Sequence, residues 1–187
     1  FNIGFDSACN IAVNSDGSVT LTEGSTDIGG TRASIAMQAA EVLTIPYENV
    51  RPTVVDTDSV GFTAVTGGSR TTFATGWAAY EAAQDVRTKM INRAAGIWEV
   101  DSGDIELADG VFRSKSDPEL SMTFKELASQ LGSTGGGITG TAAVNPSGVG
   151  GAFAGNIVDV EIDPETGKTE ILRFTVVQDA GKAIHPS

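Results

Sequence analysis

Apolar and polar residues alternate along three stretches of the chain, and each stretch is centred on a turn-forming sequence. They cover 9–22 around Asp16-Gly17, 104–115 around Asp109-Gly110, and 156–177 around the turn 163–167. Strict alternation places every second side chain on one face of a strand, and Asp-Gly favours a tight hairpin turn. The sequence therefore predicts three β-hairpins. A short strand over 50–56 is also predicted, and Pro52 favours an edge position for it because proline cannot donate to a strand on that side.

Helical spacing appears in two longer segments. Apolar residues recur three and four positions apart from about Arg32 to Leu43, and again from about Ser69 to Ala95. A shorter helix is expected from Thr123, whose capping box with Glu126 opens it, to near Leu131. Hairpins and helices intermingle without repeated strand–helix–strand units. The expected class is α+β, with β-hairpins and a mixed sheet packed against two longer amphipathic helices.

Residues 132–151 are rich in glycine and carry no charge. Gly135 to Gly140 satisfies G-x-G-x-x-G, but this stretch follows a predicted helix and leads into Pro146, whereas a dinucleotide fingerprint follows a strand and opens a helix. A loop is the favoured interpretation. We expect one domain over 1–187, with two sub-lobes divided near 96–103 or within 132–151 as the alternative.

Composition excludes some classes of function. Lys and Arg number 12 against 24 Asp and Glu, a net charge of −12, so non-specific nucleic-acid binding is not expected. No apolar run is long enough to span a bilayer, and Cys9 is the only cysteine. These features favour a reducing, cytoplasmic setting without a membrane partner. The chain begins at Phe1 and ends at Ser187, and we expect it to be a fragment of a longer polypeptide.

The strongest candidate for a binding site opens the longest predicted helix. It comprises Gly67, Gly68, Ser69, Arg70, Thr71 and Thr72. The first amides of a helix lack internal acceptors and carry partial positive charge, so they attract anions. Glycines allow close approach of a ligand, hydroxyls donate, and arginine can hold a phosphate with two N–H groups. The alternative is an ordinary helix start with a solvent-facing arginine.

A second stretch of this kind, Thr26 to Thr31, precedes the other long helix. Taken alone it is an ordinary capped turn. Two such helix starts in one chain are, however, compatible with one elongated, multiply charged ligand.

Catalytic residues are not evident. His185 is the single histidine, so with Cys9 alone it cannot complete a tetrahedral zinc site without carboxylates, and no nucleophile elbow accompanies it. We therefore expect neither a catalytic residue nor a metal site in this chain.

Several segments together resemble a known family. They are, in chain order, Thr26-Asp27-Ile28-Gly29, SIAMQAAEVLTIPYENV, Asp56-Thr57-Asp58, Gly67-Gly68-Ser69-Arg70-Thr71-Thr72, Val160–Lys168 and Gln178–Ile184. Their order and spacing resemble the molybdopterin-binding region of the large subunit of the xanthine dehydrogenase and aldehyde oxidase family. The resemblance implies that the chain holds the phosphate and nucleotide end of a molybdopterin cofactor, such as its cytosine dinucleotide form. It implies an oxidoreductase parent that hydroxylates aldehydes or N-heterocycles with water, with iron–sulfur and FAD groups on partner subunits or domains.

The resemblance adds residues at the first helix start and at the end of the chain. Where the family commonly has Asp-x-Gly-Gln-Gly-x-x-Thr, this sequence has Gly29, Gly30, Thr31 and Ser34 at the third, fourth, fifth and eighth positions. His185 replaces the asparagine of the family's common Ile-Asn-Pro. These five residues join the expected cofactor contacts. The family's catalytic glutamate lies outside this chain, so the isolated chain is expected to be inactive. The rival hypotheses are a non-catalytic phosphate- or nucleotide-binding module and a purely structural domain.

Overall fold

The computed structural model describes residues 5–148, 151–179 and 181–182. The chain divides into two compact units, Phe1–Ser147 and Gly148–Ser187. The boundary between them falls inside the glycine-rich stretch 132–151. The first unit contains mixed α and β structure with several sheets, and the second contains one hairpin, so the expected α+β class is confirmed.

A four-stranded mixed sheet forms the centre of the first unit. Its strands are β1 (Ser7–Val13), β2 (Val19–Glu23), β3 (Val50–Val54) and β7 (Thr139–Val144), in the order β3-β2-β1-β7. β1 is antiparallel to β2 and β7, and β2 is parallel to β3. The predicted first hairpin is confirmed, with the Gly17 amide bonded to the Asn14 carbonyl at 3.0 Å. β3 is an edge strand, as Pro52 indicated.

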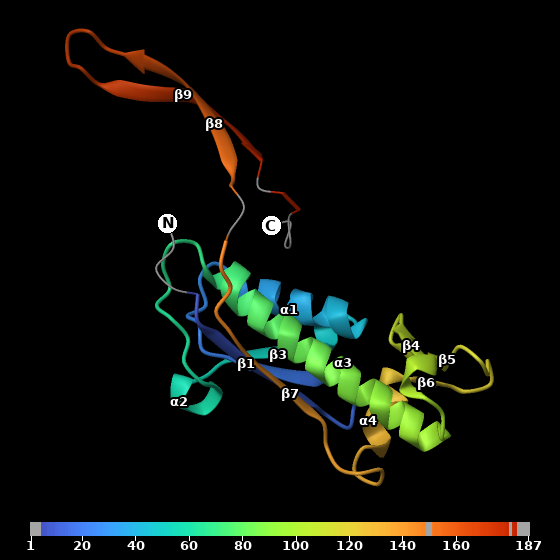
Figure 1. Ribbon diagram of the computed structural model, residues 1–187. Coiled ribbons are helices and arrows are strands. Elements are labelled where there is room, and N and C mark those ends of the chain that lie inside the picture. Colours follow the sequence, from blue (N-terminus) through green and yellow to red (C-terminus); the bar gives the residue numbers. More distant parts are fainter. Residues whose placement is uncertain (1–4, 149–150, 180, 183–187) are drawn as a thin grey trace. The chain divides into compact units, whose positions relative to one another are not determined.

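Two helices, α1 (Thr31–Leu43) and α3 (Gly76–Trp98), lie side by side across the sheet (Figure 1). Their alanine-rich inner faces are fully buried against Ile11, Leu21 and neighbouring strand residues. Small side chains allow the two helices to approach one another and the strands closely. The expected helix 69–95 starts later than predicted. A π-helical turn, η2 (Thr71–Thr75), precedes α3, and Ser69 has a left-handed backbone (φ 58°) that no α-helix contains.

A smaller subsheet packs at the C-terminal end of α3. It contains β4 (Ile105–Ala108), β5 (Val111–Ser114) and β6 (Ser121–Thr123), followed by α4 (Phe124–Gln130). The predicted capping box is confirmed, because the Glu126 amide donates to Thr123 Oγ1 at 3.2 Å and the Thr123 amide donates to Glu126 Oε2 at 2.7 Å. Short 3-10 turns, η1 (Tyr47–Asn49) and η3 (Ser102–Asp104), connect the elements.

Two elements were not predicted from the sequence. A single helical turn, α2 (Thr57–Val60), is capped by Asp56, which accepts from the Asp58 amide at 2.9 Å. Strand β7 lies within the glycine-rich stretch, and its Gly140 faces α3. A Cβ added at Gly140 would lie 2.2 Å from the Ala82 carbonyl oxygen of α3. Glycine here therefore permits close strand–helix packing.

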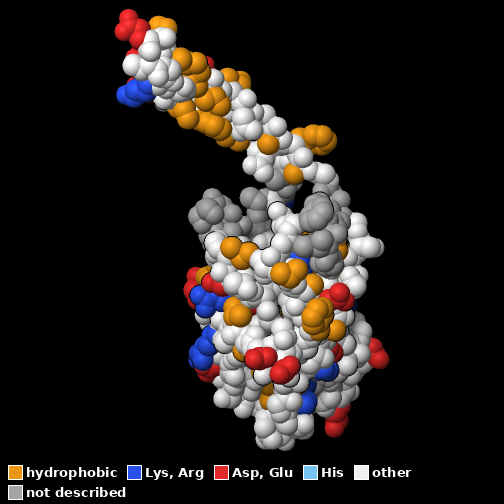
Figure 2. All heavy atoms as spheres, turned by 90° about the vertical axis from the view of Figure 1, so that its left-hand side faces the viewer, with side chains coloured by type: hydrophobic (Ala, Val, Ile, Leu, Met, Phe, Trp, Pro, Cys, Tyr) orange, Lys and Arg blue, Asp and Glu red, His pale blue; other side chains and the backbone are white. Residues whose placement is uncertain are grey.

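The second unit is the third predicted hairpin, which is confirmed. Strands β8 (Phe153–Ile162) and β9 (Thr169–Asp179) are antiparallel, and the Gly167 amide closes the turn onto the Asp163 carbonyl at 2.8 Å. Opposed residues share a face, so Val158 pairs with Phe174. Many of its large apolar side chains are exposed, and Figure 2 shows them gathered along the hairpin.

Candidate functional site

The first helix start is built on two left-handed glycines. Gly29 (φ 57°) and Gly30 (φ 83°) turn the chain into α1, and Gly30 is its N-cap. A side chain at either glycine would meet open space. Asp27 accepts from the Arg32 amide at 3.2 Å and from Arg32 Nε at 2.6 Å, which holds the pKa of this carboxyl below its usual value. The Asp27 charge is thereby partly neutralised at the start of α1.

The second helix start leads into η2. Gly68 (φ 61°) and Ser69 (φ 58°) are both left-handed, and both are exposed. Among the described residues, the amides of Gly67, Gly68 and Ser69 have no hydrogen-bond acceptor. Three such amides just before a long helical segment are donors of the kind that an anionic group requires.

The structure brings the two helix starts together. Gln38, on the second turn of α1, donates through Nε2 to the Thr72 carbonyl at 3.2 Å and to the Ser34 carbonyl at 3.4 Å. Gly76 makes room for this amide, because a Cβ at that position would lie 2.3 Å from Gln38 Nε2. The two loops therefore lie beside one another, as a single elongated ligand would require.

Arg70 does not face solvent. It is 1% exposed, and its Nη1 donates to the Ala64 carbonyl and its Nη2 to the Asp6 carbonyl, both at 2.9 Å. Nη2 also donates to the Ser7 hydroxyl. The alternative of a solvent-facing arginine is wrong. A phosphate contact by Arg70 stays a prediction, and the structure shows a second use of this side chain, which ties loop 61–70 to β1.

A buried chain of polar side chains continues from Arg70 beneath both loops. Ser7 Oγ lies 3.1 Å from Thr75 Oγ1, and Thr75 Oγ1 lies 2.6 Å from Ser25 Oγ. The Ser25 amide donates to a carboxylate oxygen of Glu23, the last residue of β2. All five side chains are at most 2% exposed.

Burial raises the pKa of Glu23 to about 7, with a further increase from the Asp27 charge; the Ser25 amide and the charges of Arg32 and Arg70 act in the opposite direction. Glu23 Oε1, Arg70 Nε and Thr71 Oγ1 are buried and have no partner among the described residues. Unpaired buried polar atoms of this kind are rare in folded proteins.

The comparisons with known proteins identify the family. The family model of the molybdopterin cofactor-binding domain matches residues 1–187. The chain belongs to this family.

Relatives of this cofactor-binding domain are large subunits of oxidoreductases. The chain is 31% identical over 188 residues to the carbon monoxide dehydrogenase large chain of Afipia carboxidovorans, and the match covers 97% of this chain and 23% of that protein. It is 29% identical to the 6-hydroxypseudooxynicotine dehydrogenase complex subunit gamma of Paenarthrobacter nicotinovorans, covering 94% of this chain and 23% of that protein. The chain thus spans about a quarter of the length of these relatives.

Solved structures show the same fold. Reconstituted CO dehydrogenase from Oligotropha carboxidovorans superposes with a TM-score of 0.86 at 29% identity, covering 96% of this chain and 23% of that chain. Quinoline 2-oxidoreductase from Pseudomonas putida 86 superposes with a TM-score of 0.83 at 26% identity, covering 99% of this chain and 24% of that chain. Both units of this cofactor-binding domain are therefore shared with these enzymes.

The expected site residues are distributed unevenly. Ten of them, at Gly29, Gly30, Thr31, Ser34 and 67–72, lie in or beside the two adjoining loops. Thr31 accepts from the Ile28 amide at 3.0 Å and donates to Asp27 at 3.2 Å, so its hydroxyl serves the turn. His185 lies outside the described residues. The site roles of all eleven stay predictions.

Sequence reasoning missed Gln38, Glu23, Ser25 and Thr75. Gln38 sits among alanines on a helix, where a glutamine is unremarkable. An acidic residue ending a buried strand was the one available signal for Glu23, because a carboxylate is rarely buried without a partner.

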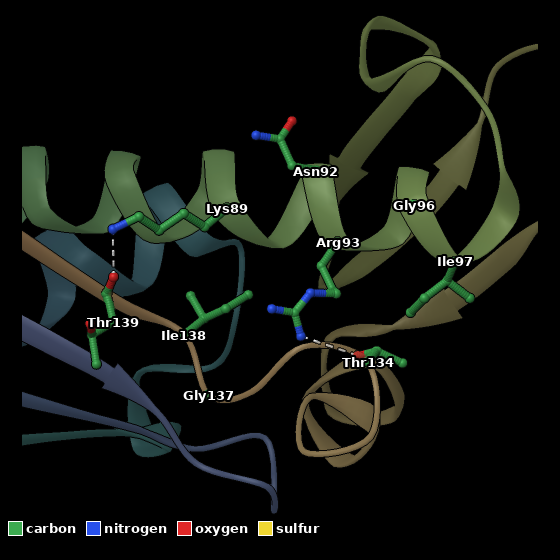
Figure 3. A pocket seen from close by; sticks show the side chains of 9 residues that line it. All are labelled: Lys89, Asn92, Arg93, Gly96, Ile97, Thr134, Gly137, Ile138 and Thr139. Carbon is green, nitrogen blue, oxygen red and sulfur yellow. Dashed lines mark hydrogen bonds between the residues drawn. The ribbon is translucent and has the colours of Figure 1, made fainter.

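A separate groove of about 840 Å³ lies between α3 and the segment 134–139 (Figure 3). The two cationic side chains that line it, Arg93 and Lys89, donate hydrogen bonds to groups of the protein. Arg93 Nη1 donates to the carbonyls of Leu131 and Gly136 and to the Thr134 hydroxyl, and Lys89 donates to Asp85 and to the Thr139 carbonyl. The groove contains neither glycine loop, and its charges stabilise the glycine-rich segment.

Within the ranges that the structure describes, no group of three or more His, Cys, Asp or Glu side chains is placed to hold a metal ion. None of the helices described has both the length and the apolar character needed to cross a bilayer.

Proposed function

We propose that this chain is part of the large subunit of a molybdenum hydroxylase of the xanthine dehydrogenase and aldehyde oxidase type. In this proposal the loops 26–34 and 66–72 hold the phosphate and nucleotide end of its molybdopterin cofactor. The observation that carries the proposal is the pair of glycine-rich helix starts, which adjoin through Gln38, the second with amides that lack an acceptor among the described residues. Family membership supplies the identity of the cofactor.

The donor set fits a phosphate group. Within the described part of the chain, the amides of residues 67–69 have no acceptor, and both loops carry left-handed glycines that keep Cβ atoms away from a ligand. The hydroxyls of Ser69 and Thr72 can add donors. The carboxylate in the first loop, on Asp27, forms an ion pair with Arg32, with 2.6 Å between Oδ2 and Nε. Local donors can therefore bind an anion although the whole chain carries a net charge of −12.

In the complete enzyme, the cofactor would supply the molybdenum at which a substrate carbon is oxidised and water provides the oxygen. The residues of this chain would bind and orient the cofactor rather than contact the reacting carbon. The names of two relatives, nicotine 6-hydroxylase and a probable hypoxanthine oxidase, favour an N-heterocycle over an aldehyde as substrate. Electrons would leave through iron–sulfur and FAD groups on partner subunits or domains, in a cytoplasmic complex with the remainder of the large subunit.

The test is cofactor content in the full-length large subunit. Gly68→Val should block cofactor insertion, because it adds a β-branched side chain at a left-handed position on the ligand side. Gly136→Val is the matched control, since Gly136 is also left-handed (φ 91°) and a Cβ there meets open space, far along the chain from both loops. Molybdenum is measured by mass spectrometry, and the nucleotide released by acid hydrolysis is identified by chromatography.

We expect Gly68→Val to lose most of its molybdenum and nucleotide while Gly136→Val retains both. Equal cofactor content in the two variants contradicts the placement of the site. Release of a nucleotide without molybdenum or pterin from the wild-type protein favours the nucleotide-binding module instead. Release of a cytosine nucleotide identifies the cytosine dinucleotide form.

A further inference from the structure

The buried polar network of Arg70, Ser7, Thr75, Ser25 and Glu23 contacts both loops. Its members come from β1 (Ser7), the end of β2 (Glu23), the residue just before the first loop (Ser25), the second loop (Arg70) and η2 (Thr75). The contacts of Thr75 Oγ1 with Ser25 Oγ at 2.6 Å and with Ser7 Oγ at 3.1 Å join segments 50 and 68 residues apart in sequence. This network of side chains therefore connects the start of the first loop with the end of the second.

Glu23 is the last member of this buried network and contributes a buried carboxylate. It is 1% exposed in the central strand β2, and one of its carboxylate oxygens accepts from the Ser25 amide while the other has no partner among the described residues. Burying a carboxylate is unfavourable, and replacing a buried charge with a neutral residue of similar size often stabilises a protein. Stability of the fold therefore does not account for a carboxylate at this position.

We propose that Glu23 is a positioning residue that couples the two cofactor-binding loops. Its carboxylate holds the Ser25 amide, Ser25 holds Thr75, and Thr75 and Ser7 hold the segment that carries Arg70. In this way the start of the first loop is fixed relative to the end of the second. The proposal rests on the proposed function for the ligand of these loops, but the coupling itself is a property of the protein without cofactor.

The charge on Glu23 adds a dependence on pH. The ionisable groups that face it are Asp27 in the first loop, Arg32 on α1, Arg70 before η2 and Cys9 on β1. A phosphate bound at the loops would add a negative charge beside Glu23 and favour its protonated form, as Asp27 already does. Cofactor should consequently be retained better below neutral pH than above it, and a neutral isostere at residue 23 should remove that difference.

The experiment measures hydrogen exchange by mass spectrometry in the cofactor-free, full-length large subunit, on peptides covering 24–31 and 61–72. Four variants are compared with the wild type: Glu23→Ala, Glu23→Gln, Thr75→Val and the exposed control Glu41→Gln. Loss of the link should speed exchange of both peptides by roughly tenfold in Glu23→Ala and Thr75→Val, since local opening becomes easier. Glu23→Gln keeps an acceptor for the Ser25 amide and should stay within roughly threefold of wild type.

A second readout follows cofactor retention from pH 6 to pH 8 in the loaded protein. The wild type should release cofactor faster at the higher pH, Glu23→Gln should show no such change, and Glu41→Gln should behave as the wild type. If Glu23→Ala does not fold, Glu23→Gln and Thr75→Val still decide the question.

The coupling is overturned if exchange of 61–72 is unchanged in Glu23→Ala, or if only Thr75→Val affects both loops. A pH dependence of release that persists in Glu23→Gln overturns the role of the charge. These outcomes are distinct from failure of the proposed function. If Gly68→Val retains its cofactor while both loops respond to Glu23→Ala, the coupling stands and the ligand assignment is wrong.

Discussion

Replacing Arg70 with alanine tests whether this residue supports the fold, binds phosphate, or does both. The substitution removes a guanidinium that is 1% exposed and that donates to three oxygens, on Ala64, Asp6 and Ser7. We expect Arg70→Ala to destabilise the protein in the absence of any cofactor. We also expect it to lower cofactor occupancy, because loop 61–70 loses one of its attachments to β1 and to the residue before it.

The expected change in the free energy of unfolding depends on which of the three oxygens keeps another hydrogen-bond partner. The Asp6 carbonyl still accepts from the Ala64 amide at 2.8 Å, and the Ser7 hydroxyl still contacts Thr75. Within the described residues, only the Ala64 carbonyl is left without a donor, which costs about 1–3 kcal/mol. Loss of the buried aliphatic stem adds to this cost, whereas removal of a buried charge offsets part of it. A net loss of about 2–4 kcal/mol in the free energy of unfolding is expected.

The assay is urea unfolding of cofactor-free protein, followed by circular dichroism at constant pH. Arg51→Ala is the matched control, because Arg51 pairs with Asp16 at 3.0 Å on the surface with a side chain 62% exposed. An exposed pair of this kind contributes at most about 1 kcal/mol. Arg70→Lys should fall between the two, since one ammonium cannot reproduce the planar arrangement of donors.

The structural role is refuted if Arg70→Ala costs no more than Arg51→Ala. If the cofactor-free variant is as stable as the control and cofactor occupancy still collapses, Arg70 acts through the ligand. A loss of stability with unchanged cofactor content would leave the fold as its only role.

Four further outcomes are expected. Gly140→Ala should destabilise the protein by at least about 2 kcal/mol in urea unfolding, because its Cβ would lie 2.2 Å from a backbone oxygen of α3, whereas Gly137→Ala, with open space around the added Cβ, should change little. Gly68→Val should leave the thermal midpoint of the cofactor-free protein within a few degrees of that of Gly136→Val while lowering molybdenum content, and an equal loss of both properties would favour a plain loop. The pKa of Glu23 is raised to about 7 in the folded protein from 4.5, so its contribution to stability is fully present below pH 4.5 and is lost as the pH rises through 7. The thermal midpoint of Glu23→Gln should therefore rise relative to that of the wild type between pH 5 and pH 8. The isolated chain should unfold cooperatively and should oxidise neither aldehydes nor purines with dye acceptors, and turnover by the fragment would place catalytic residues inside it. In the same chain, the amides of 153–179 should exchange with solvent faster than those of the four-stranded sheet, because a two-stranded hairpin alone is marginal in water.

Local sequence determined those elements whose signal is contained within a few neighbouring residues. Three hairpins follow from alternation around tight turns, and α4 follows from the reciprocal bonds of Thr123 and Glu126. The positive backbone angles of Gly29, Gly30 and Gly68 are compatible with local sequence, because glycine adopts them without a steric cost. These features need no partner from elsewhere in the chain, so both loops can be located from the order of residues alone.

Strand β7 shows what local sequence conceals. Thr139–Val144 lacks the large alternating side chains of a typical strand, and its place in the sheet depends on pairing with β1, more than a hundred residues earlier. Gly140 is required because α3 packs directly against it. The predicted start of the long helix is also wrong, since Gly68 and Ser69 turn left-handed before η2 begins.

The roles of the charged residues were decided only by tertiary structure. From sequence, Arg70 is a donor beside two glycines, and Glu23 is the polar end of a strand. Their burial depends on Ser7, Ser25 and Thr75, which lie far apart in the chain and meet only when the sheet and helices pack. A side chain's solvation and its hydrogen-bond partners are set by that packing, and so the sequence by itself located the loops while the fold decided what supports them.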